Sequence, residues 1–286
     1  MKRSHIKSYK AILTVLFLII VSQANAQKLP NVQTASLRAP ANIKIDGKTT
    51  EWDNNFQAYN RATEVFYTLS NDDNYLYLTV QATIPEVISK IIGGGITFTM
   101  QKSGKKVDKD GMSITYPIFT KDNRPFLGIS MRMSMENGVM KSESTMPPMN
   151  DSTINARNAQ LREKSKYIGV TGIGKLDSMI SVYNEDGIKT AEAINNKGAY
   201  TYELAIDLKL LGLSANDLSK FAYHMVLNGL GKPGNMTIKI AGGDGSAESK
   251  AAAEAATSEL MSKLAAANGN TFSPTDFWGE YTLAKK

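Results

Sequence analysis

The sequence contains no cysteine, and only one of its two histidines, His224, lies beyond the first 26 residues. The absence of cysteine excludes a disulfide framework, a thiolate metal site, a cysteine nucleophile and a lipid anchor on an N-terminal cysteine. A single histidine leaves few ways to build a nucleophile–base pair. Without disulfides the fold must rely on a hydrophobic core, and about 260 residues are enough to form one.

Catalytic and nucleotide-binding motifs are also absent. The sequence has no Gly-x-Ser-x-Gly, no His-Glu-x-x-His and no nucleotide-binding loop. Gly93-Gly94-Gly95 lacks the Lys-Ser/Thr of a phosphate loop, and Asp108 to Gly111 lacks the further oxygen ligands of a calcium loop. We therefore expect a protein that is not an enzyme and that holds neither a cofactor nor a metal. A two-carboxylate hydrolase is the enzyme class that these absences leave open.

The longest markedly apolar run, Ala11 to Val21, lies close to the N-terminus. Lys2, Arg3, Lys7 and Lys10 precede or adjoin it, and Ala24-Asn25-Ala26 follows as a small-x-small cleavage site. This order is typical of a secretory signal peptide, and the run is too short to span a bilayer comfortably. We predict that residues 1–26 are removed, leaving Gln27 first. The mature chain would then be secreted or periplasmic, without a transmembrane segment.

The net positive charge is small once this leader is set aside. The whole chain has 33 basic and 27 acidic residues, a formal net charge of +6. Four of the basic residues and none of the acidic ones lie in residues 1–26, so the remainder carries 29 basic against 27 acidic residues, or +2. This near balance gives no reason to expect nucleic acid as a partner.

The remaining sequence consists largely of short alternating segments. Residues 27–40 are expected to form an extended lead-in. Ile43 and Ile45 alternate with polar residues before an Asp46-Gly47 turn, which suggests a strand. Val65 to Leu69 and Tyr75 to Val80 flank an Asn/Asp-rich turn and predict a hairpin, because Asn and Asp tolerate positive φ.

Further segments complete a predicted antiparallel β-sandwich over residues 41–286, with a few short helices. Strands are expected at Ile96–Gln101, Met112–Ile118, Ala199–Ile206, Phe221–Asn228, Asn235–Ala241 and Phe277–Leu283, and a hairpin joins Met179–Tyr183 to Ile188–Ile194. Helical segments are expected at Ile84–Ile92, at Asp151–Lys166 with Asp151 or Ser152 as its cap, and at Leu208–Leu213. Residues 242–270 are Ala-rich and predict a helical insertion, for which a mobile lid is the functional alternative.

Two side-chain groups have both a structural and a chemical interpretation. Met131, Met133 and Met135 alternate, and Met140, Met146 and Met149 follow. Thioethers bind Cu(I), but alternating methionines also form an adaptable core or surface, which we favour. His224 lies in an alternating strand, so a packed histidine is expected instead of a catalytic or metal-bound one.

The arrangement resembles the family 9 carbohydrate-binding modules and their DOMON-like relatives. Ile45-Asp46-Gly47, Glu51-Trp52, the strand Tyr75-Leu76-Tyr77-Leu78 and the late Phe277-Trp278-Gly279 carry the resemblance. It implies an extracellular, non-enzymatic β-sandwich. Two features depart from the family: no aromatic pair matches its sugar clamp, and Thr79 to Thr83 lacks its carboxylate, which weakens the case for calcium there.

These observations lead to two expected functions. The first is a secreted binding module for a glycan or other small ligand, with Tyr59, Tyr67, Tyr116 and Tyr183 as candidate binding residues. The second is a structural or interaction protein of the bacterial cell envelope that binds no sugar. Asp46, Gly47, Trp52 and Trp278 are expected to be structural, with both tryptophans mainly in the core.

Overall fold

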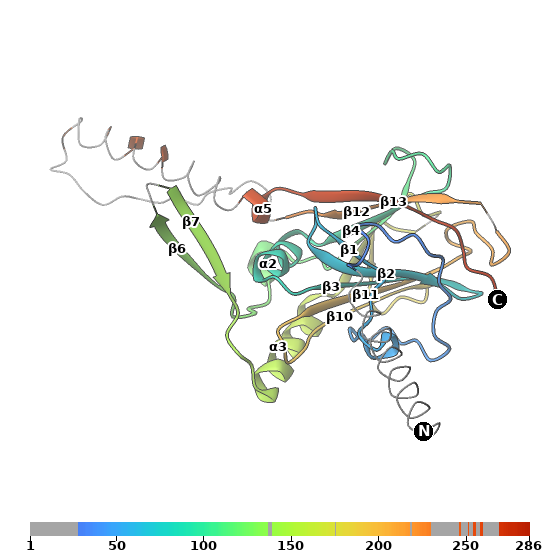
Figure 1. The fold of residues 1–286 in the computed structure, drawn as a ribbon, viewed down its shortest axis with the longest axis horizontal. Coiled ribbons are helices and arrows are strands. Elements are labelled where there is room, and N and C mark those ends of the chain that lie inside the picture. Colours follow the sequence, from blue (N-terminus) through green and yellow to red (C-terminus); the bar gives the residue numbers. More distant parts are fainter. Residues whose placement is uncertain are drawn as a thin grey trace, which may run out of the picture.

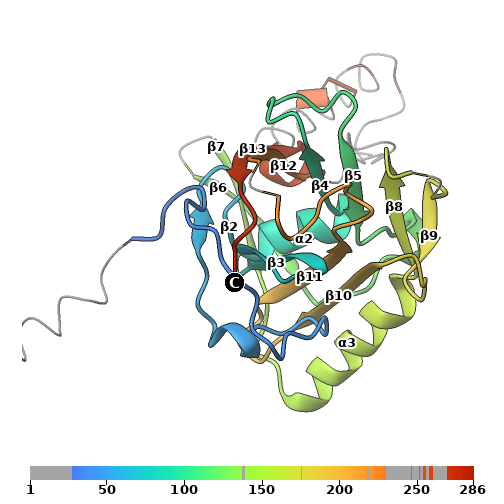
Figure 2. The ribbon, with the colours of Figure 1, turned by 90° about the vertical axis from the view of Figure 1, so that its right-hand side faces the viewer.

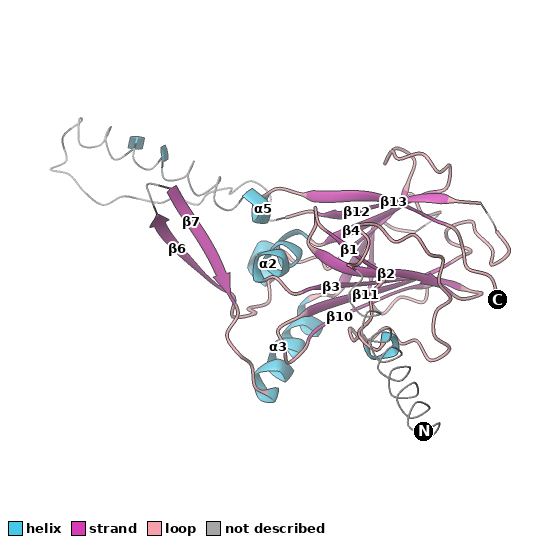
Figure 3. Cartoon of the chain, viewed as in Figure 1, coloured by secondary structure: helices cyan, strands magenta, loops and turns pink. Residues whose placement is uncertain are grey.

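The computed structural model describes residues 28–136, 139–174, 176–217, 219–229 and 269–286, together with isolated positions between 246 and 259. Its body consists of two antiparallel β-sheets that pack face to face (Figure 1). Helices lie around these sheets (Figure 3). The predicted all-β sandwich is therefore confirmed. Within these residues no helix combines the length and the apolar character needed to cross a membrane.

Every strand pairs antiparallel to its neighbours. The first sheet has the spatial order β1 (Ala58–Asn60), β2 (Val65–Asn71), β3 (Tyr75–Ala82), β11 (Tyr200–Asp207), β10 (Ile188–Ile194). The second has the order β13 (Thr275–Tyr281), β12 (Phe221–Leu227), β4 (Ile96–Gln101), β5 (Met112–Tyr116), β8 (Tyr167–Thr171), β9 (Met179–Ser181). A separate hairpin, β6 (Ser130–Glu136) and β7 (Val139–Thr145), projects from the body (Figure 1).

The helices are short and lie outside the sheets. Those whose bounds the structure describes are α2 (Pro85–Gly94), α3 (Asp151–Lys164) and α5 (Gly269–Phe272), with single 3₁₀ turns η2 (Thr50–Trp52) and η3 (Lys121–Asn123). Pro85 occupies the first turn of α2, where a missing N–H costs nothing, and Gly95 ends that helix with φ 77°. The cap of α3 is Asn150, which accepts from the Thr153 N–H at 2.9 Å, so the expected cap at Asp151 or Ser152 is wrong by one or two residues.

Polar turns form two of the hairpins of the first sheet. Between β2 and β3, Asp72 accepts hydrogen bonds from the backbone N–H groups of Asn74 and Tyr75, both at 2.7 Å. Between β10 and β11, Asn195 does the same for Lys197 and Ala199. The Asn and Asp side chains replace strand partners in each turn, so the predicted β2–β3 hairpin and the turn before β11 are confirmed.

The predicted hairpin of Met179–Tyr183 with Ile188–Ile194 is wrong. The first segment forms β9, which pairs with β8 in the six-stranded sheet, whereas the second forms β10, which pairs with β11 in the five-stranded sheet. The intervening turn therefore carries the chain from one sheet to the other. Alternation and turn residues identify two strands, but they do not identify their partners.

Other predicted segments differ from the structure or lie outside it. Residues 43–45 have no strand pairing, although β-like alternation suggested one. The predicted strand Asn235–Ala241 and most of the Ala-rich insertion at 242–270 lie outside the described residues.

The core joins the inward faces of both sheets. Tyr67 on β2 and Tyr223 on β12 are fully buried, and their hydroxyl oxygens lie 2.9 Å apart across the sandwich. Tyr202 on β11 and Tyr116 on β5 stack with ring centroids 5.7 Å apart. Buried aliphatic side chains of α2, including Ile88 and Ile91, add to this core. The rings of these tyrosines add apolar surface to the core. Where the hydroxyl has a hydrogen-bond partner, as in Tyr67 and Tyr223, the buried oxygen is also satisfied.

The two ends of the described fold contact each other. Ser36 in the lead-in donates to the Thr282 carbonyl at 2.6 Å, and the Leu37 N–H donates to the Tyr281 hydroxyl at 3.0 Å. Asn71 at the end of β2 accepts from the Ala284 N–H at 2.7 Å. The lead-in and the C-terminal residues therefore cover the same side of the sandwich.

Candidate functional site

A cavity of about 550 Å³ lies beside β10, which forms one side of the five-stranded sheet next to α3 (Figure 2). We call it the edge cavity. It is lined by Ile45, Asp46, Lys48, Tyr116, Asn155, Asn158, Arg162, Ser165, Val182, Tyr183, Thr190, Ala191, Glu192 and Ala193. Its volume is in the range of small-molecule sites.

The free side of β10 gives this cavity backbone donors and acceptors. Asn158 of α3 donates to the Ile194 carbonyl at 2.9 Å and accepts from its N–H at 2.7 Å, while Asn184 donates to the Ile188 carbonyl at 2.9 Å. Peptide groups alternate in direction along an antiparallel strand. Those of Thr190 and Glu192 therefore point the same way as those of Ile188 and Ile194, toward the cavity side.

Glu192 is the most unusual side chain of this cavity. It follows Ile188 and Thr190 on the inward face of β10 and is only 4% exposed. Its Oε2 accepts a hydrogen bond from the Tyr200 hydroxyl, whereas its Oε1 has no hydrogen-bond partner among the described residues. Burial raises the pKa of Glu192 to about 7, although the nearby hydroxyls of Tyr200, Ser165 and Tyr116 oppose this shift. The carboxyl can therefore exchange a proton near neutral pH.

Two hydroxyl groups near Glu192 are similarly without partners. Within the described part of the chain, neither Thr190 Oγ1 nor the Tyr202 hydroxyl makes a hydrogen bond. Tyr202 is fully buried, and burial raises its pKa well above the usual value. Leaving a buried polar group unsatisfied costs about 1–3 kcal/mol. A polar ligand or water that met these groups would recover part of that cost.

Aromatic rings line the same cavity at different depths. Tyr116 is 3% exposed, and its hydroxyl donates to Ser165 Oγ at 2.9 Å. Tyr183 is 74% exposed, and Lys166 lies over its ring and donates to its hydroxyl at 2.9 Å. The cavity thus combines a buried ring with an exposed one, and an exposed ring can stack on a ligand without cost to the core.

Helix α3 supplies the other polar wall. Asn155, Asn158 and Arg162 are spaced three and four residues apart and therefore share one face of the helix. Arg162 lies in its last turn and is exposed. Amide and guanidinium groups on one side and a carboxyl on the other suit a ligand with several hydroxyl or carboxylate oxygens.

The four candidate tyrosines separate into two groups. Tyr116 and Tyr183 line the edge cavity. Tyr67 lies in the core, where its hydroxyl meets Tyr223 and accepts from the Gln33 N–H at 2.8 Å. Tyr59 lies on β1 at the opposite side of the sheet and packs on Phe66 with ring centroids 4.6 Å apart. Neither Tyr59 nor Tyr67 contributes to the cavity.

The Asp46-Gly47 motif holds the segment that forms one wall of the edge cavity. Glu203 Oε2 accepts from the N–H groups of Asp46 and Gly47, both at 2.9 Å. Gly47 has φ 79°, and a Cβ there would lie 2.6 Å from the Glu192 carbonyl carbon. Only glycine fits this close approach. Trp52 follows on η2 and is 9% exposed, in line with a core position.

Trp278 is not a core residue, contrary to expectation. Phe277 points inward and is buried, while Trp278 points to the outer face of β13 and is half-buried. There it stacks on His224 with ring centroids 4.2 Å apart. Both ring nitrogens of His224 are engaged, by Asp108 at 2.8 Å and by Asp276 at 2.9 Å. This buried histidine is therefore packed, as expected.

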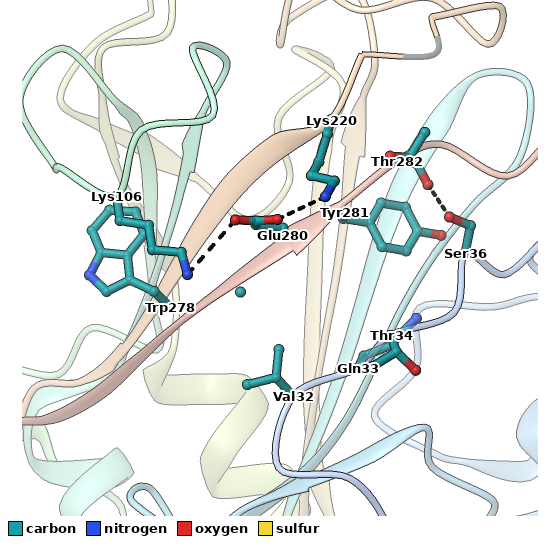
Figure 4. Close-up of a pocket in the computed structure, with 11 residues that line it drawn as sticks. Val32, Gln33, Thr34, Ser36, Lys106, Lys220, Trp278, Glu280, Tyr281 and Thr282 are labelled. Atoms are coloured by element: carbon teal, nitrogen blue, oxygen red, sulfur yellow. Dashed lines mark hydrogen bonds and ion pairs between the residues drawn. The ribbon is translucent and has the colours of Figure 1, made fainter.

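A second cavity, of about 440 Å³, lies along β13 beside Trp278 (Figure 4). Lys106 and Lys220 both approach Glu280, at 3.8 and 3.0 Å, and Ser36 donates to the Thr282 carbonyl. The charged side chains of this second cavity are thus paired with one another. The edge cavity is the stronger candidate because its buried polar groups retain unused hydrogen-bonding capacity.

The sequence alone did not indicate Glu192, Thr190 and Arg162, which line the edge cavity. One signal was present: a glutamate occupies the inward phase of the alternating strand Ile188–Ile194, where an apolar residue is expected. Among the described residues, no group of three or more acidic or histidine side chains is placed to hold a metal ion. No protein-family model matches the chain, and neither a curated protein nor a solved structure matches it significantly.

Proposed function

We propose that the protein is a non-catalytic binding module whose edge cavity holds a small polar ligand of the glycan class. The observation that carries the proposal is the buried Glu192 carboxyl, whose Oε1, like the Thr190 and Tyr202 hydroxyls, has no hydrogen-bond partner among the described residues. Sugar hydroxyls both donate and accept hydrogen bonds. The faces of sugar rings also stack on exposed aromatic side chains such as Tyr183.

The resemblance to family 9 carbohydrate-binding modules supports the same ligand class. The signal-peptide pattern supports a mature protein that begins at Gln27 and acts outside the cytoplasm, either secreted or periplasmic. The intact mass of the exported protein tests this part of the proposal. A mass that retained residues 1–26 would contradict it.

Binding is tested by calorimetric titration of the mature full chain with members of a glycan panel, comparing Tyr183→Ala with Tyr167→Ala. Both tyrosines are strongly exposed, but only Tyr183 lines the edge cavity. An aromatic stacking contact contributes about 0.5–1.5 kcal/mol, so Tyr183→Ala should weaken binding about two- to tenfold with little change in melting temperature. Tyr167→Ala should bind like the parent. Equal effects of the two substitutions, or no glycan bound by the parent, would refute the proposal.

The non-catalytic part is tested separately. Prolonged incubation with a bound oligosaccharide should release no new reducing ends. If new reducing ends appeared with the parent protein but not with Glu192→Gln, the protein would instead be a hydrolase.

The second candidate is an envelope interaction protein that binds no sugar. The observation that favours it is the β6–β7 hairpin, which stands away from the sandwich (Figure 1). Replacing residues 131–144 by a short Gly-Ser linker should then abolish retention in the envelope fraction. If the hairpin has no such role, this variant will fractionate like the parent.

A further inference from the structure

A neighbouring cavity of about 330 Å³ adjoins the edge cavity. We call it the outer cavity, and it is lined by Ile43, Lys44, Ile45, Tyr75, Tyr77, Val182, Lys189, Thr190 and Ala205. Ile45, Val182 and Thr190 line both cavities. The two spaces therefore meet at these three residues, and together they run from α3 past β10 onto the outward face of the five-stranded sheet.

The walls of this joint space are fixed by contacts already described. On one side the segment 43–48 is held by Glu203 through the N–H groups of Asp46 and Gly47. On the other side Val182 follows β9, just before the crossover to β10. The floor includes Ala191 and Ala205, whose small side chains leave room above the sheet. The segment 43–48, Val182 and these small side chains thus bound the joint space, which we call the cleft.

An aromatic ring is present at each end of the cleft. Tyr183 lies at the edge cavity, and Tyr75 lies at the outer cavity. Tyr75 packs beside Tyr77 with ring centroids 6.0 Å apart, and the Tyr77 hydroxyl donates to Asp72 at 2.7 Å. The Lys189 ammonium lies over the Tyr75 ring, 5.4 Å from its centroid, so this ring and this cation form one end of the cleft together. Ring-stacking sites at both ends suit a chain of sugar rings better than a single one.

The cleft also carries more positive than negative charge. Lys44, Lys189 and Arg162 line it and form no ion pair with any other residue that the structure describes. Lys48 is partnered by Asp46 at 3.4 Å. The remaining acidic residue is Glu192, and burial raises its pKa to about 7, which reduces its negative charge at neutral pH. The unpaired cations therefore dominate.

We propose that the edge and outer cavities form one continuous cleft that binds an acidic oligosaccharide, with carboxylate-bearing sugars placed against Lys44, Lys189 and Arg162. This inference rests on the proposed glycan-binding function and specifies its ligand. Tyr183 and Tyr75 stack on rings at the two ends, while Glu192 and the peptide groups of β10 meet hydroxyls at the inner end.

An acidic peptide is the competing ligand for a cationic cleft beside a free strand. A peptide strand gains its affinity from a run of main-chain hydrogen bonds along a sheet edge. Here Asn158 occupies the edge at Ile194 and Asn184 occupies it at Ile188, so only Thr190 and Glu192 remain free between them. Two residues are too few for strand addition, which favours the oligosaccharide.

The test is calorimetric titration of the mature full chain at pH 7 with uronate tetrasaccharides of the galacturonate, mannuronate and guluronate types, and with neutral galacto- and manno-tetraoses. A tetraglutamate peptide is the peptide probe. The double variant Lys44→Gln/Lys189→Gln is compared with Lys105→Gln/Lys109→Gln, which removes the same charge from exposed positions outside the cleft.

The expected result is that at least one uronate tetrasaccharide binds tenfold or more tightly than its neutral counterpart. The cleft double variant should reduce that affinity at least tenfold, while the control double variant changes it less than twofold. Tyr75→Ala should weaken the tetrasaccharide and leave uronate monosaccharide binding unchanged.

Several results would overturn the inference. Neutral tetraoses that bind as tightly as uronates would refute the acidic ligand and leave the proposed glycan function intact. If both double variants lost the same affinity for the uronate, only long-range electrostatic attraction would be shown. If tetraglutamate bound more tightly than every uronate, the cleft would be a peptide site. Failure of every sugar to bind would refute the proposed function itself, and the inference with it.

Discussion

Two buried glutamates one strand apart show how the surroundings of a residue separate structure from function. Glu203 on β11 uses one oxygen to accept two backbone N–H groups and thereby holds Asp46 and Gly47 in place. Glu192 on β10 accepts a hydrogen bond from Tyr200 and keeps Oε1 without a partner among the described residues. Glu203 Oε1 is likewise without a partner among the described residues, but Glu203 lines neither cavity beside β10, whereas Glu192 lines the edge cavity.

Gly47→Ala tests the close approach of the Asp46-Gly47 turn to β10. A Cβ at this position would lie 2.6 Å from a backbone carbon of Glu192, and the backbone has φ 79°. We expect the free energy of unfolding in urea to fall by about 2–3 kcal/mol. Gly174→Ala is the matched control, because Gly174 has φ 51° but no atom within 4 Å of its Cβ position. It should lose only about 1 kcal/mol. Equal losses would mean that the contact with β10 is unimportant.

The two tryptophans should differ in their contribution to stability. Trp52 is buried, so Trp52→Ala should cost about 3–5 kcal/mol of unfolding free energy. Trp278 is half-buried and stacks on His224, and such an aromatic contact contributes about 0.5–1.5 kcal/mol. Urea unfolding of both variants measures the difference. A larger loss for Trp278→Ala than for Trp52→Ala would contradict these positions.

Residue-level reading of the sequence identified some of the site and missed its centre. Tyr116 and Tyr183 are candidates because sugar recognition needs flat aromatic platforms, and both line the edge cavity. Tyr67 was indistinguishable from them, because alternation does not reveal which tyrosine meets the opposite sheet. The sequence alone does not mark Glu192, because a charge within a strand usually lies on the solvent face, although its phase matches Ile188 and Ile194.

At the scale of elements, strand positions could be predicted but their partners could not. Tight polar turns fix hairpins such as β2–β3, where the turn residues and both strands carry the information. The turn between β9 and β10 looks similar in sequence, yet its strands enter different sheets. Long-range pairing with β8 and β11 decides the outcome there. The edge cavity lies beside this crossover, so predicting a hairpin at this point concealed the site.

Asn158→Ala tests the attachment of α3 to β10. The Asn158 side chain makes two hydrogen bonds to the backbone of Ile194, at 2.9 and 2.7 Å. Losing them leaves strand groups unsatisfied, so we expect a loss of about 1–3 kcal/mol in urea unfolding. Asn155→Ala, one turn earlier on the exposed surface of the same helix, should change stability by less than about 0.5 kcal/mol. If the two variants lost the same amount, the helix would be held by other contacts.

At the scale of the whole molecule, the buried glutamates make stability depend on pH. Desolvation raises the pKa of both Glu192 and Glu203 from 4.5 to about 7, and hydrogen bonds oppose the shift in each case. Between these values the folded protein binds more protons than the unfolded chain, so its stability falls as pH rises from about 4.5 to 7. Each glutamate contributes at most about 3 kcal/mol to this fall.

Urea unfolding of the mature protein at pH 5 and at pH 7.5 measures this effect. The protein should be more stable at pH 5, and Glu192→Gln and Glu203→Gln should each reduce the difference. Stability that rose over this interval would show that the two carboxyls are ionised in the folded state.

The contact between Ser36 and Thr282 has a consequence for folding. Ser36 and Thr282 are 246 positions apart, and their hydrogen bond helps to close one side of the sandwich. Ala284 also exchanges two hydrogen bonds with the side chain of Asn71 on β2. During synthesis from the N-terminus these contacts cannot form until residues 282–284 have been made. This side of the sandwich therefore closes late, and pairing segments so far apart in the sequence is a slow step in folding.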